Sequence, residues 1–318
     1  MVLTSQNAKE LLTHQTNNWD QARSNYEALS KVEVKEFILD GFTLRVQFNP
    51  GRIQSSAAKV DAKSVSERKC FLCPQNLPAA QEAIPFNNEY QVLVNPFPIF
   101  PRHFTIPSYK HIDQLILNRY VDMLDLAKAL DEFVIFYNGP KCGASAPDHA
   151  HFQAGNKGFL PIEKDLDRID KVILLESEKA TLSVSKGYLC NVLFINSSSK
   201  RNAVSLFKKL YSLLEIKGGD SEPMMNILTW YNDGNWNTCI FLREKHRPDC
   251  YFEEGVENIL ISPASVDLGG MFITPLEKDF HKITGKDLHA ILREVCIPDA
   301  KMNEVMNKIK GLQIWSRI

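Results

Sequence analysis

The stretch Asp148-His149-Ala150-His151-Phe152-Gln153 places two histidines and a glutamine at alternate positions. We predict a strand over residues 149–154, and on a strand residues two apart point to the same face. The two imidazoles and the amide would then project together. Such a row offers a nucleophilic nitrogen, a second nitrogen able to bind a metal, and a neutral hydrogen-bond donor. A chance polar face on an exposed strand would have the same pattern, so the flanking segments decide between the two interpretations.

The segment just before this row is rich in small residues. It reads Gly139-Pro140-Lys141-Cys142-Gly143-Ala144-Ser145 and runs directly into the predicted strand. Glycines and small residues let backbone N–H groups turn towards an anion. An ordinary connecting loop is the alternative, but the position before the histidines favours a phosphate-binding loop that includes Gly143, Ala144 and Ser145.

Cys70 and Cys73 have the Cys-x-x-Cys spacing of zinc ligands. One such pair supplies two of four ligands, so histidines should complete the site. We predict a closed, structural zinc site of Cys70, Cys73, His111 and His149, which leaves His151 free. His103 is the rival for the third position, and two reduced, buried cysteines without a metal are the remaining alternative.

The pattern of apolar residues predicts an α+β protein. Helices are predicted within the first 30 residues, with Leu11, Leu12 and Trp19 buried, and at 111–133 and 198–214, with two or three short helices at the end. Strands are predicted at 91–94, 100–106, 133–137, 171–176, 181–184 and 189–195. Asp40-Gly41 and Asp233-Gly234 predict hairpins within 32–48 and between 225–231 and 236–242. Residues 50–68 are interpreted as a mobile loop.

Composition limits the function classes. The chain has 318 residues, of which 44% are hydrophobic, so we expect a packed protein of two domains. The formal net charge of −1 gives no reason to expect a nucleic-acid partner. Residues 1–19 lack the pattern of a signal peptide. No run approaches the ~18 apolar residues of a membrane-spanning helix. We therefore expect a soluble, cytoplasmic protein without a membrane partner or a disulfide framework.

The two halves of the chain repeat one theme, because each runs through strands, a helix and further strands. This suggests two related α+β halves built on antiparallel sheets. We predict a catalytic half at 1–165, which includes an N-terminal helical extension, and a second half at 166–318. The second half contains no His-x-His motif, so we expect it to shape the pocket or a dimer. A homodimer is left open.

Taken together, these motifs resemble the transferase branch of the histidine-triad superfamily. The resemblance rests on Cys-x-x-Cys, Asn95-Pro96-Phe97-Pro98, Lys110-His111, Gly-x-Ser and His-x-His-x-Gln. The branch includes galactose-1-phosphate uridylyltransferase, diadenosine tetraphosphate phosphorylase and the GDP-hexose phosphorylases. The run 143–154 and the segment 262–271 are especially similar to the last group. The resemblance covers roughly residues 65–300 and implies two histidine-triad-like halves.

The resemblance also implies roles for single residues. His151 matches the histidine that forms a covalent nucleotidyl intermediate, and Gln153 matches the residue that hydrogen-bonds the phosphoryl oxygens. Ser145 matches a phosphate-loop serine, and Asn95 matches an asparagine on the nucleotide side. The cysteines and histidines of the predicted zinc site match the ligands of the zinc-bearing members. Asp148 departs from the family pattern, in which an apolar residue or asparagine is more familiar.

The expected activity is that of a nucleotidyltransferase or phosphorylase. Its substrate would be an NDP-sugar or a dinucleoside polyphosphate, with phosphate or a sugar phosphate as acceptor. From the family we take the hypothesis that the His149 carbonyl accepts the Nδ1 proton of His151. Gln153 favours transfer over hydrolysis, since hydrolases of the superfamily usually carry a third histidine there. The alternatives are a silent nucleotide-binding protein, a nucleotide hydrolase and a zinc-stapled interaction protein.

Charge for the substrate phosphates could come from three side chains of the first half, Arg102, Lys110 and Lys141. The run Arg243-Glu244-Lys245-His246-Arg247 is a further basic cluster. We interpret it as a solvated strand end.

Overall fold

The computed structural model describes residues 2–53, 57 and 61–315. The helices are α1 (Ser5–Asn18), α2 (Asp20–Leu29), α4 (Ala62–Glu67), α5 (Tyr120–Ala129), α6 (Pro161–Asp165), α7 (Lys200–Tyr211), α8 (Ser265–Leu268), α9 (Glu277–Lys282), α10 (Gly285–Val295) and α11 (Asp299–Trp315), with short 3-10 turns η1 (Pro50–Arg52), η2 (Pro74–Asn76) and η3 (Asp249–Tyr251). The strands are β1 (Glu33–Leu39), β2 (Phe42–Phe48), β3 (Ala83–Phe86), β4 (Tyr90–Val94), β5 (His103–Pro107), β6 (Phe133–Asn138), β7 (His151–Asn156), β8 (Asp170–Ser177), β9 (Ala180–Lys186), β10 (Leu193–Ser197), β11 (Met225–Asn232), β12 (Asn235–Leu242) and β13 (Met271–Thr274). The predicted α+β class is confirmed.

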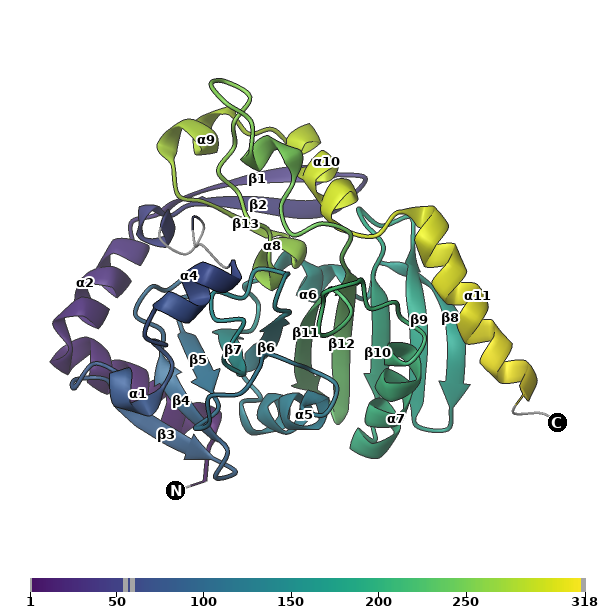
Figure 1. Ribbon diagram of the computed structural model, residues 1–318, viewed down its shortest axis with the longest axis horizontal. Helices are drawn as coiled ribbons and strands as arrows, with labels where there is room; N and C mark the ends of the chain where they lie inside the picture. Colours follow the sequence, from purple (N-terminus) through teal and green to yellow (C-terminus); the bar gives the residue numbers. More distant parts are fainter. Residues whose placement is uncertain (1, 54–56, 58–60, 316–318) are drawn as a thin grey trace.

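Ten strands form one sheet across the molecule, in the order β3-β4-β5-β7-β6-β11-β12-β10-β9-β8 (Figure 1). The first five strands come from the first half and the last five from the second. In each half, three sequential strands are followed by a helix, α5 or α7, and then by two more strands. The last strand of each half inserts beside the third, so the two halves have the same topology. Antiparallel pairing of β6 with β11 joins them. The division at residue 165 stays a prediction.

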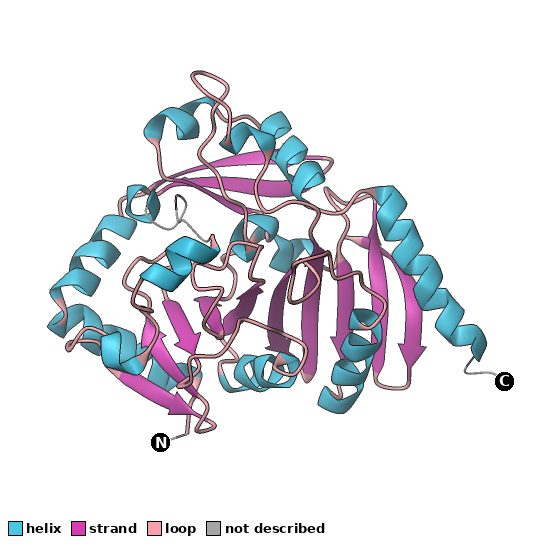
Figure 2. Cartoon of the chain, in the orientation of Figure 1, coloured by secondary structure: helices cyan, strands magenta, loops and turns pink. Residues whose placement is uncertain are grey.

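Strand β6 shows why the sheet carries a core on each face. All six of its residues are buried, because alternate side chains enter different cores. Phe133, Ile135 and Tyr137 pack with α1, α5, α7 and α11. Val134 and Phe136 pack on the opposite face with β2, β13, α8 and α10. A small sheet lies on one side of the large sheet, and helices α5 and α7 lie on the other (Figure 2).

The small sheet has the order β1-β2-β13 and begins with the predicted hairpin. Leu39 pairs with Phe42, so Asp40 and Gly41 form a two-residue turn. Their φ angles are 50° and 83°, as a turn of type I′ requires. Strand β13 then pairs parallel to β2. This pairing fixes the 262–274 region of the second half beside the first half.

Most predicted elements are confirmed. Asp233-Gly234 joins β11 to β12, and Leu11, Leu12 and Trp19 are buried in or beside α1. None of the seven cysteines, all of which lie in described residues, forms a disulfide. Within the predicted loop 50–68, the described residues include η1 and α4, while 54–56 and 58–60 lie outside the described part of the chain.

The prediction of a helix at 111–133 is wrong for its first third. Helix α5 begins at Tyr120. Residues 111–118 are not helical and lie alongside the segment that precedes β7. The Ala150 N–H donates to the Ile112 carbonyl at 2.6 Å, and the Gln114 N–H donates to the Pro147 carbonyl at 3.2 Å. Tertiary contacts therefore override an apolar spacing that resembles a helix face.

Strand β7 begins two residues later than predicted, at His151. His149 lies in the turn before the strand, so its ring does not share the face of His151.

In the described residues, no helix is both long enough and apolar enough to cross a bilayer.

Candidate active site

A cavity of about 630 Å³ lies on the face of the large sheet that carries Phe136. His151 and Gln153 of β7 both line it. Gln153 pairs with Phe136 across the sheet, so these side chains share one face. Phe152 and Ala154 are buried in the core on the opposite face. The predicted alternation therefore holds for His151 and Gln153.

The ring of His151 is held by one hydrogen bond. Its Nδ1 lies 2.8 Å from the backbone carbonyl of His149, as the sequence hypothesis requires. A carbonyl can only accept, so Nδ1 carries the proton and Nε2 carries the lone pair. Burial lowers the pKa of His151 to about 4, which keeps the imidazole neutral near pH 7. A neutral nitrogen nucleophile therefore lines the cavity.

The backbone of His151 is clamped by a side chain that the sequence argument missed. Gln114 Oε1 accepts the His151 N–H at 2.8 Å, and Gln114 Nε2 donates to the His151 carbonyl at 3.0 Å. The carboxamide thus pairs with the first residue of β7 as a neighbouring strand would. The only signal was a glutamine within an apolar pattern, which the helix prediction left unexplained.

The predicted phosphate loop lines the cavity through Gly143, Ala144 and Ser145. Gly143 has a φ of 91°, and a Cβ there would lie 2.6 Å from the Cβ of Ala264. Both the backbone conformation and the close contact require glycine. The second half anchors the loop, because Asn226 Nδ2 donates to the Cys142 carbonyl at 2.8 Å.

Asn95 also lines the cavity, at the end of β4. Its Oδ1 accepts the Phe97 N–H at 2.9 Å, and its Nδ2 contacts Thr105 Oγ1 at 2.9 Å. The side chain therefore shapes the turn Asn95-Pro96-Phe97-Pro98 from within. Any contact of Asn95 with a nucleotide stays a prediction.

The cations that line the cavity differ from those expected. Arg102 and Lys110 are exposed, and Lys141 is paired with Asp220. None of these three residues lines the cavity, which instead carries Arg52, Arg68 and Arg247 from three distant segments.

The interpretation of 243–247 as a solvated strand end is wrong. Arg243 is 2% exposed, and its guanidinium donates to Asn226 Oδ1 at 2.5 Å and to the Pro263 carbonyl at 2.9 Å. Asn226 in turn holds the phosphate loop. His246 and Arg247 line the cavity. Arg243, His246 and Arg247 are therefore part of the cavity wall or of its support, while Glu244 and Lys245 form ion pairs nearer the surface.

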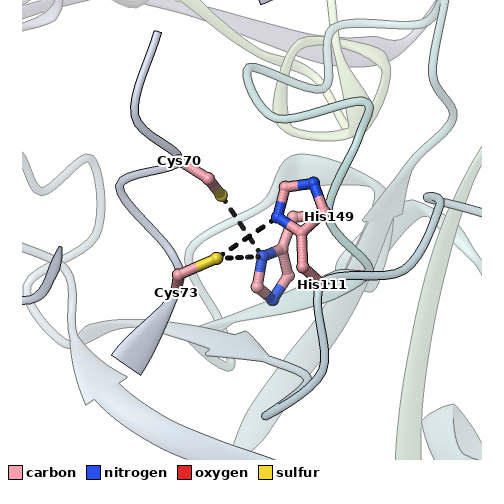
Figure 3. Close-up of side chains that lie close together, drawn as sticks. All are labelled: Cys70, Cys73, His111 and His149. Carbon is pink, nitrogen blue, oxygen red and sulfur yellow. Dashed lines mark hydrogen bonds between the residues drawn. The ribbon is translucent and has the colours of Figure 1, made fainter. Parts of the chain in front are cut away.

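The predicted metal ligands come together beside the cavity (Figure 3). One ligand atom from each of Cys70, Cys73, His111 and His149 lies within 4.8 Å of all the others. Cys70 Sγ and His149 Nδ1 are 3.2 Å apart, as are Cys73 Sγ and His111 Nδ1. A tetrahedral zinc site separates sulfur from nitrogen by about 3.6 Å. The four residues therefore fit a zinc ion with small adjustments.

Each histidine of this cluster has a second partner. His149 Nε2 contacts the Ser108 carbonyl at 2.8 Å, and His111 Nε2 lies 3.4 Å from Asp148 Oδ2. Such contacts orient metal-binding imidazoles. Asp148 also accepts from Arg68 at 2.9 Å. Asp148, which differs from the pattern discussed above for this position, thus contacts both His111 of the cluster and Arg68 of the cavity.

The two cysteines of the cluster have pKa values shifted in opposite directions, and burial raises the pKa of Cys73 to about 11. Burial also opposes the ionisation of Cys70, but hydrogen bonds led by that with His149 lower the pKa of Cys70 to about 6. A thiolate is the form that binds zinc.

His103, the rival third ligand, is elsewhere. It is fully buried on β5, where its Nε2 lies 3.0 Å from Gln153 Oε1. The structure thus favours His111 for the metal cluster and places His103 behind the cavity wall.

Comparisons with known proteins agree with this architecture. The family model described as a domain of unknown function, DUF4922, matches residues 11–156. No curated protein matches the sequence. Yeast Ap4A phosphorylase Apa2 in complex with AMP has a TM-score of 0.60 at 16% identity, over 94% of this chain and 98% of its own. The same enzyme in complex with Ap4A has a TM-score of 0.56 at 16% identity, over 89% and 98%. The chain therefore has the same fold as the yeast Ap4A phosphorylase structures.

Proposed function

We propose that this chain is a nucleotidyltransferase that carries a nucleotide on His151. The observation that carries the proposal is the hydrogen bond from Nδ1 of His151 to the His149 carbonyl at 2.8 Å. It leaves the lone pair of Nε2 on a residue that lines a large cavity. Activating a nucleophile by fixing its tautomer is a form of covalent catalysis.

In the first step, Nε2 of His151 attacks the α-phosphorus of the substrate. The N–P bond forms as the bond from phosphorus to the leaving oxygen breaks, and the leaving group departs with the electron pair. The ring keeps its Nδ1 proton and becomes positively charged. The His149 carbonyl, which accepts the hydrogen bond from that N–H group, stabilises the charge.

The groups around His151 suit a phosphoryl centre. Gln153 offers a neutral amide, and residues 143–145 line the same cavity. Arg52, Arg68 and Arg247 supply positive charge along the cavity. Positioning and charge neutralisation account for most catalysis of phosphoryl transfer.

In the second step, an oxygen of phosphate or of a sugar phosphate attacks the same phosphorus and the N–P bond breaks. Gln153 cannot exchange protons near neutral pH, unlike a histidine in that position. Activation of water as an acceptor is therefore disfavoured. We infer transfer or phosphorolysis as the net reaction.

The substrate class that we propose is a dinucleoside polyphosphate or an NDP-sugar. The yeast phosphorylase of the same fold was crystallised with Ap4A and with AMP, which supports a nucleotide ligand. The cavity of about 630 Å³ is within the range of ligand pockets. Incubation with Ap4A and a panel of NDP-sugars would identify the base and the sugar of the substrate.

Zinc is the metal that we propose for Cys70, Cys73, His111 and His149. Four protein ligands make the site structural. Since His149 supplies both a ligand nitrogen and the carbonyl that holds His151, the cluster would fix the start of β7.

The test is to trap the intermediate. The protein is incubated with Ap4A and with a panel of NDP-sugars, without acceptor, and its intact mass is measured. We expect the mass of one nucleotide to be added and then released by phosphate. The His151→Ala variant should lose the adduct and at least about 10³-fold of turnover. It should still melt near the wild-type temperature, since His151 lines a cavity. A wild-type protein that binds nucleotide but never forms an adduct would refute the proposal.

A further inference from the structure

His103 is a buried histidine that neither the metal cluster nor the proposed chemistry uses. It lies on β5 and is 0% exposed. On the neighbouring strand β7, Gly155 is its direct partner, and Gln153 pairs with Thr105. His103 and Gln153 are thus diagonal neighbours whose side chains meet at 3.0 Å. The contact can therefore set the direction in which the carboxamide points.

The surroundings of His103 fix which of its nitrogens carries the proton. The backbone N–H of Ile99 donates to Nδ1 at 3.1 Å. A backbone N–H can only donate, so Nδ1 must carry a lone pair. The proton of the neutral ring is then on Nε2. A protonated ring would set two N–H groups against each other, and burial lowers the pKa of His103 to about 3.

That tautomer determines how the Gln153 amide is oriented. The Nε2–H of His103 needs an acceptor, which Oε1 of the carboxamide supplies. With its oxygen engaged there, Gln153 has its NH2 group left for the cavity that it lines. A carboxamide turned by 180° would present its oxygen to a phosphoryl anion and repel it.

We propose that His103 is a positioning residue that holds the Gln153 amide with its NH2 group towards the substrate. The inference rests on the proposed function, in which that NH2 donates to the phosphoryl oxygens. A row of one backbone amide, one imidazole and one carboxamide would then deliver a donor of fixed direction. Each member is set by the one before it, starting from the Ile99 N–H.

The packing around His103 supports a fixed ring. The rings of Phe100 and Phe136 lie 5.4 and 5.8 Å from the imidazole, centroid to centroid. A Cβ at Gly155 would lie 2.3 Å from the Phe100 ring. Glycine opposite His103 therefore makes room for the ring that confines it.

A double-mutant cycle tests the coupling, with release of nucleotide from Ap4A by phosphate as the assay. His103→Phe keeps a flat ring but removes both nitrogens. We expect kcat to fall by about 10²-fold, the loss typical of one oxyanion donor, with a smaller change in KM. In a Gln153→Ala background the same substitution should have almost no further effect. Independent, multiplicative effects would overturn the proposal.

Two further variants separate positioning from folding. His103→Gln can accept from Ile99 and donate to Gln153, so it should recover at least about tenfold of the lost kcat. Tyr26→Phe removes the hydroxyl that bonds the backbone of His103 at 3.0 Å but spares the imidazole. It should lower the melting temperature with little change in kcat. A Tyr26→Phe variant as impaired as His103→Phe would assign His103 a merely structural role.

NMR keeps this proposal separate from the proposed function. In wild-type protein labelled with 13C and 15N, His103 should carry its proton on Nε2, with a coupling through the hydrogen bond to Cδ of Gln153. This result is expected whether or not any nucleotide is turned over. A proton on Nδ1 of His103 would overturn the positioning role. Absence of turnover with the expected tautomer would instead refute the proposed function alone.

Discussion

At the scale of single residues, the site depends on atoms that have only one hydrogen-bonding option. The His149 carbonyl can only accept, so it fixes the tautomer of His151. Gln114 is bound through both ends of its carboxamide to the same residue. The motif predicted that His151 and Gln153 would share one face, and both line the cavity. It could not predict Gln114, because that contact joins residues 37 positions apart.

Gly143 permits a sharp prediction at this scale. Gly143→Ala adds a Cβ at a φ of 91° and within 2.6 Å of Ala264. We expect the free energy of unfolding to fall by more than the roughly 1–2 kcal/mol that left-handed backbone costs, and transfer activity to fall because the loop moves. Chemical denaturation and the Ap4A assay measure the two effects.

Gly187→Ala is the matched control. Its φ is 68°, but a Cβ there would have no neighbour within 4 Å, so it should show the backbone cost alone. Adding Ala264→Gly to Gly143→Ala should recover part of the stability. An equal fall in the free energy of unfolding for Gly143→Ala and Gly187→Ala would show that the contact with Ala264 is unimportant.

At the scale of elements, the segment 111–118 lies between strand β7 and the second half. Glu222 holds it from the far side. Its Oε2 accepts the Ile116 N–H at 2.8 Å, and its Oε1 is hydrogen-bonded to the Tyr137 hydroxyl. That hydroxyl also lies 3.2 Å from the Gln114 carbonyl. One hydroxyl proton cannot serve two acceptors fully, so a protonated Glu222 satisfies the group best.

Glu222→Gln therefore tests a pH dependence of stability. Burial raises the pKa of Glu222 to about 7, although bonds from Tyr137 and Ile116 oppose the shift. A carboxyl with a raised folded pKa stabilises the fold below its unfolded pKa, and that stability is lost as pH rises to about 7. Between pH 5 and 8 we expect the free energy of unfolding of the wild type to fall by about 3 kcal/mol relative to that of Glu222→Gln. Urea unfolding at several pH values measures this. Parallel pH profiles of the two proteins would contradict it.

The cluster of Cys70, Cys73, His111 and His149 is the second group that we propose to position an element. Cys70→Ser should reduce bound zinc from one ion per chain and lower the free energy of unfolding by several kcal/mol, since structural zinc binding contributes to folding. A strong chelator should have the same effect on the wild type. Metal analysis and thermal unfolding measure both, with Cys250→Ser as the control outside the cluster. Normal stability of metal-free protein would remove the zinc assignment.

Elements were predictable wherever local chemistry determines them. Asp40-Gly41 and Asp233-Gly234 specify their turns, and β6 is apolar along its whole length. The helix at 111–118 was predicted wrongly because its apolar spacing resembles a helix face, while its backbone is held by tertiary hydrogen bonds to the segment before β7 and to Glu222. The cavity arginines could not be chosen from sequence, since Arg52, Arg68 and Arg247 come from distant segments that only the tertiary fold brings to one cavity.

At the scale of the whole molecule, the site belongs to both halves. His151, the proposed nucleophile, and the predicted phosphate loop come from the first half, while Arg247, Ser262 and Asp267 line the cavity from the second. The halves also share one sheet, because β6 pairs with β11 from Ile135 to Asn138. The second half lacks the histidine motif but completes the cavity and holds the loop through Asn226. Its role is therefore supportive rather than silent.

This sharing predicts that residues 1–165 do not fold as a separate unit. Without β11, the apolar strand β6 would be an open sheet edge, which favours aggregation. The core on the Phe136 face would also lose β13 and α8. We expect the fragment 1–165 to be aggregated or molten by circular dichroism and exchange of amide hydrogens. Co-expression with 166–318 should restore soluble protein and formation of the His151 adduct. A fragment 1–165 that is monomeric, cooperatively folded and able to form the adduct would show that the halves are independent domains.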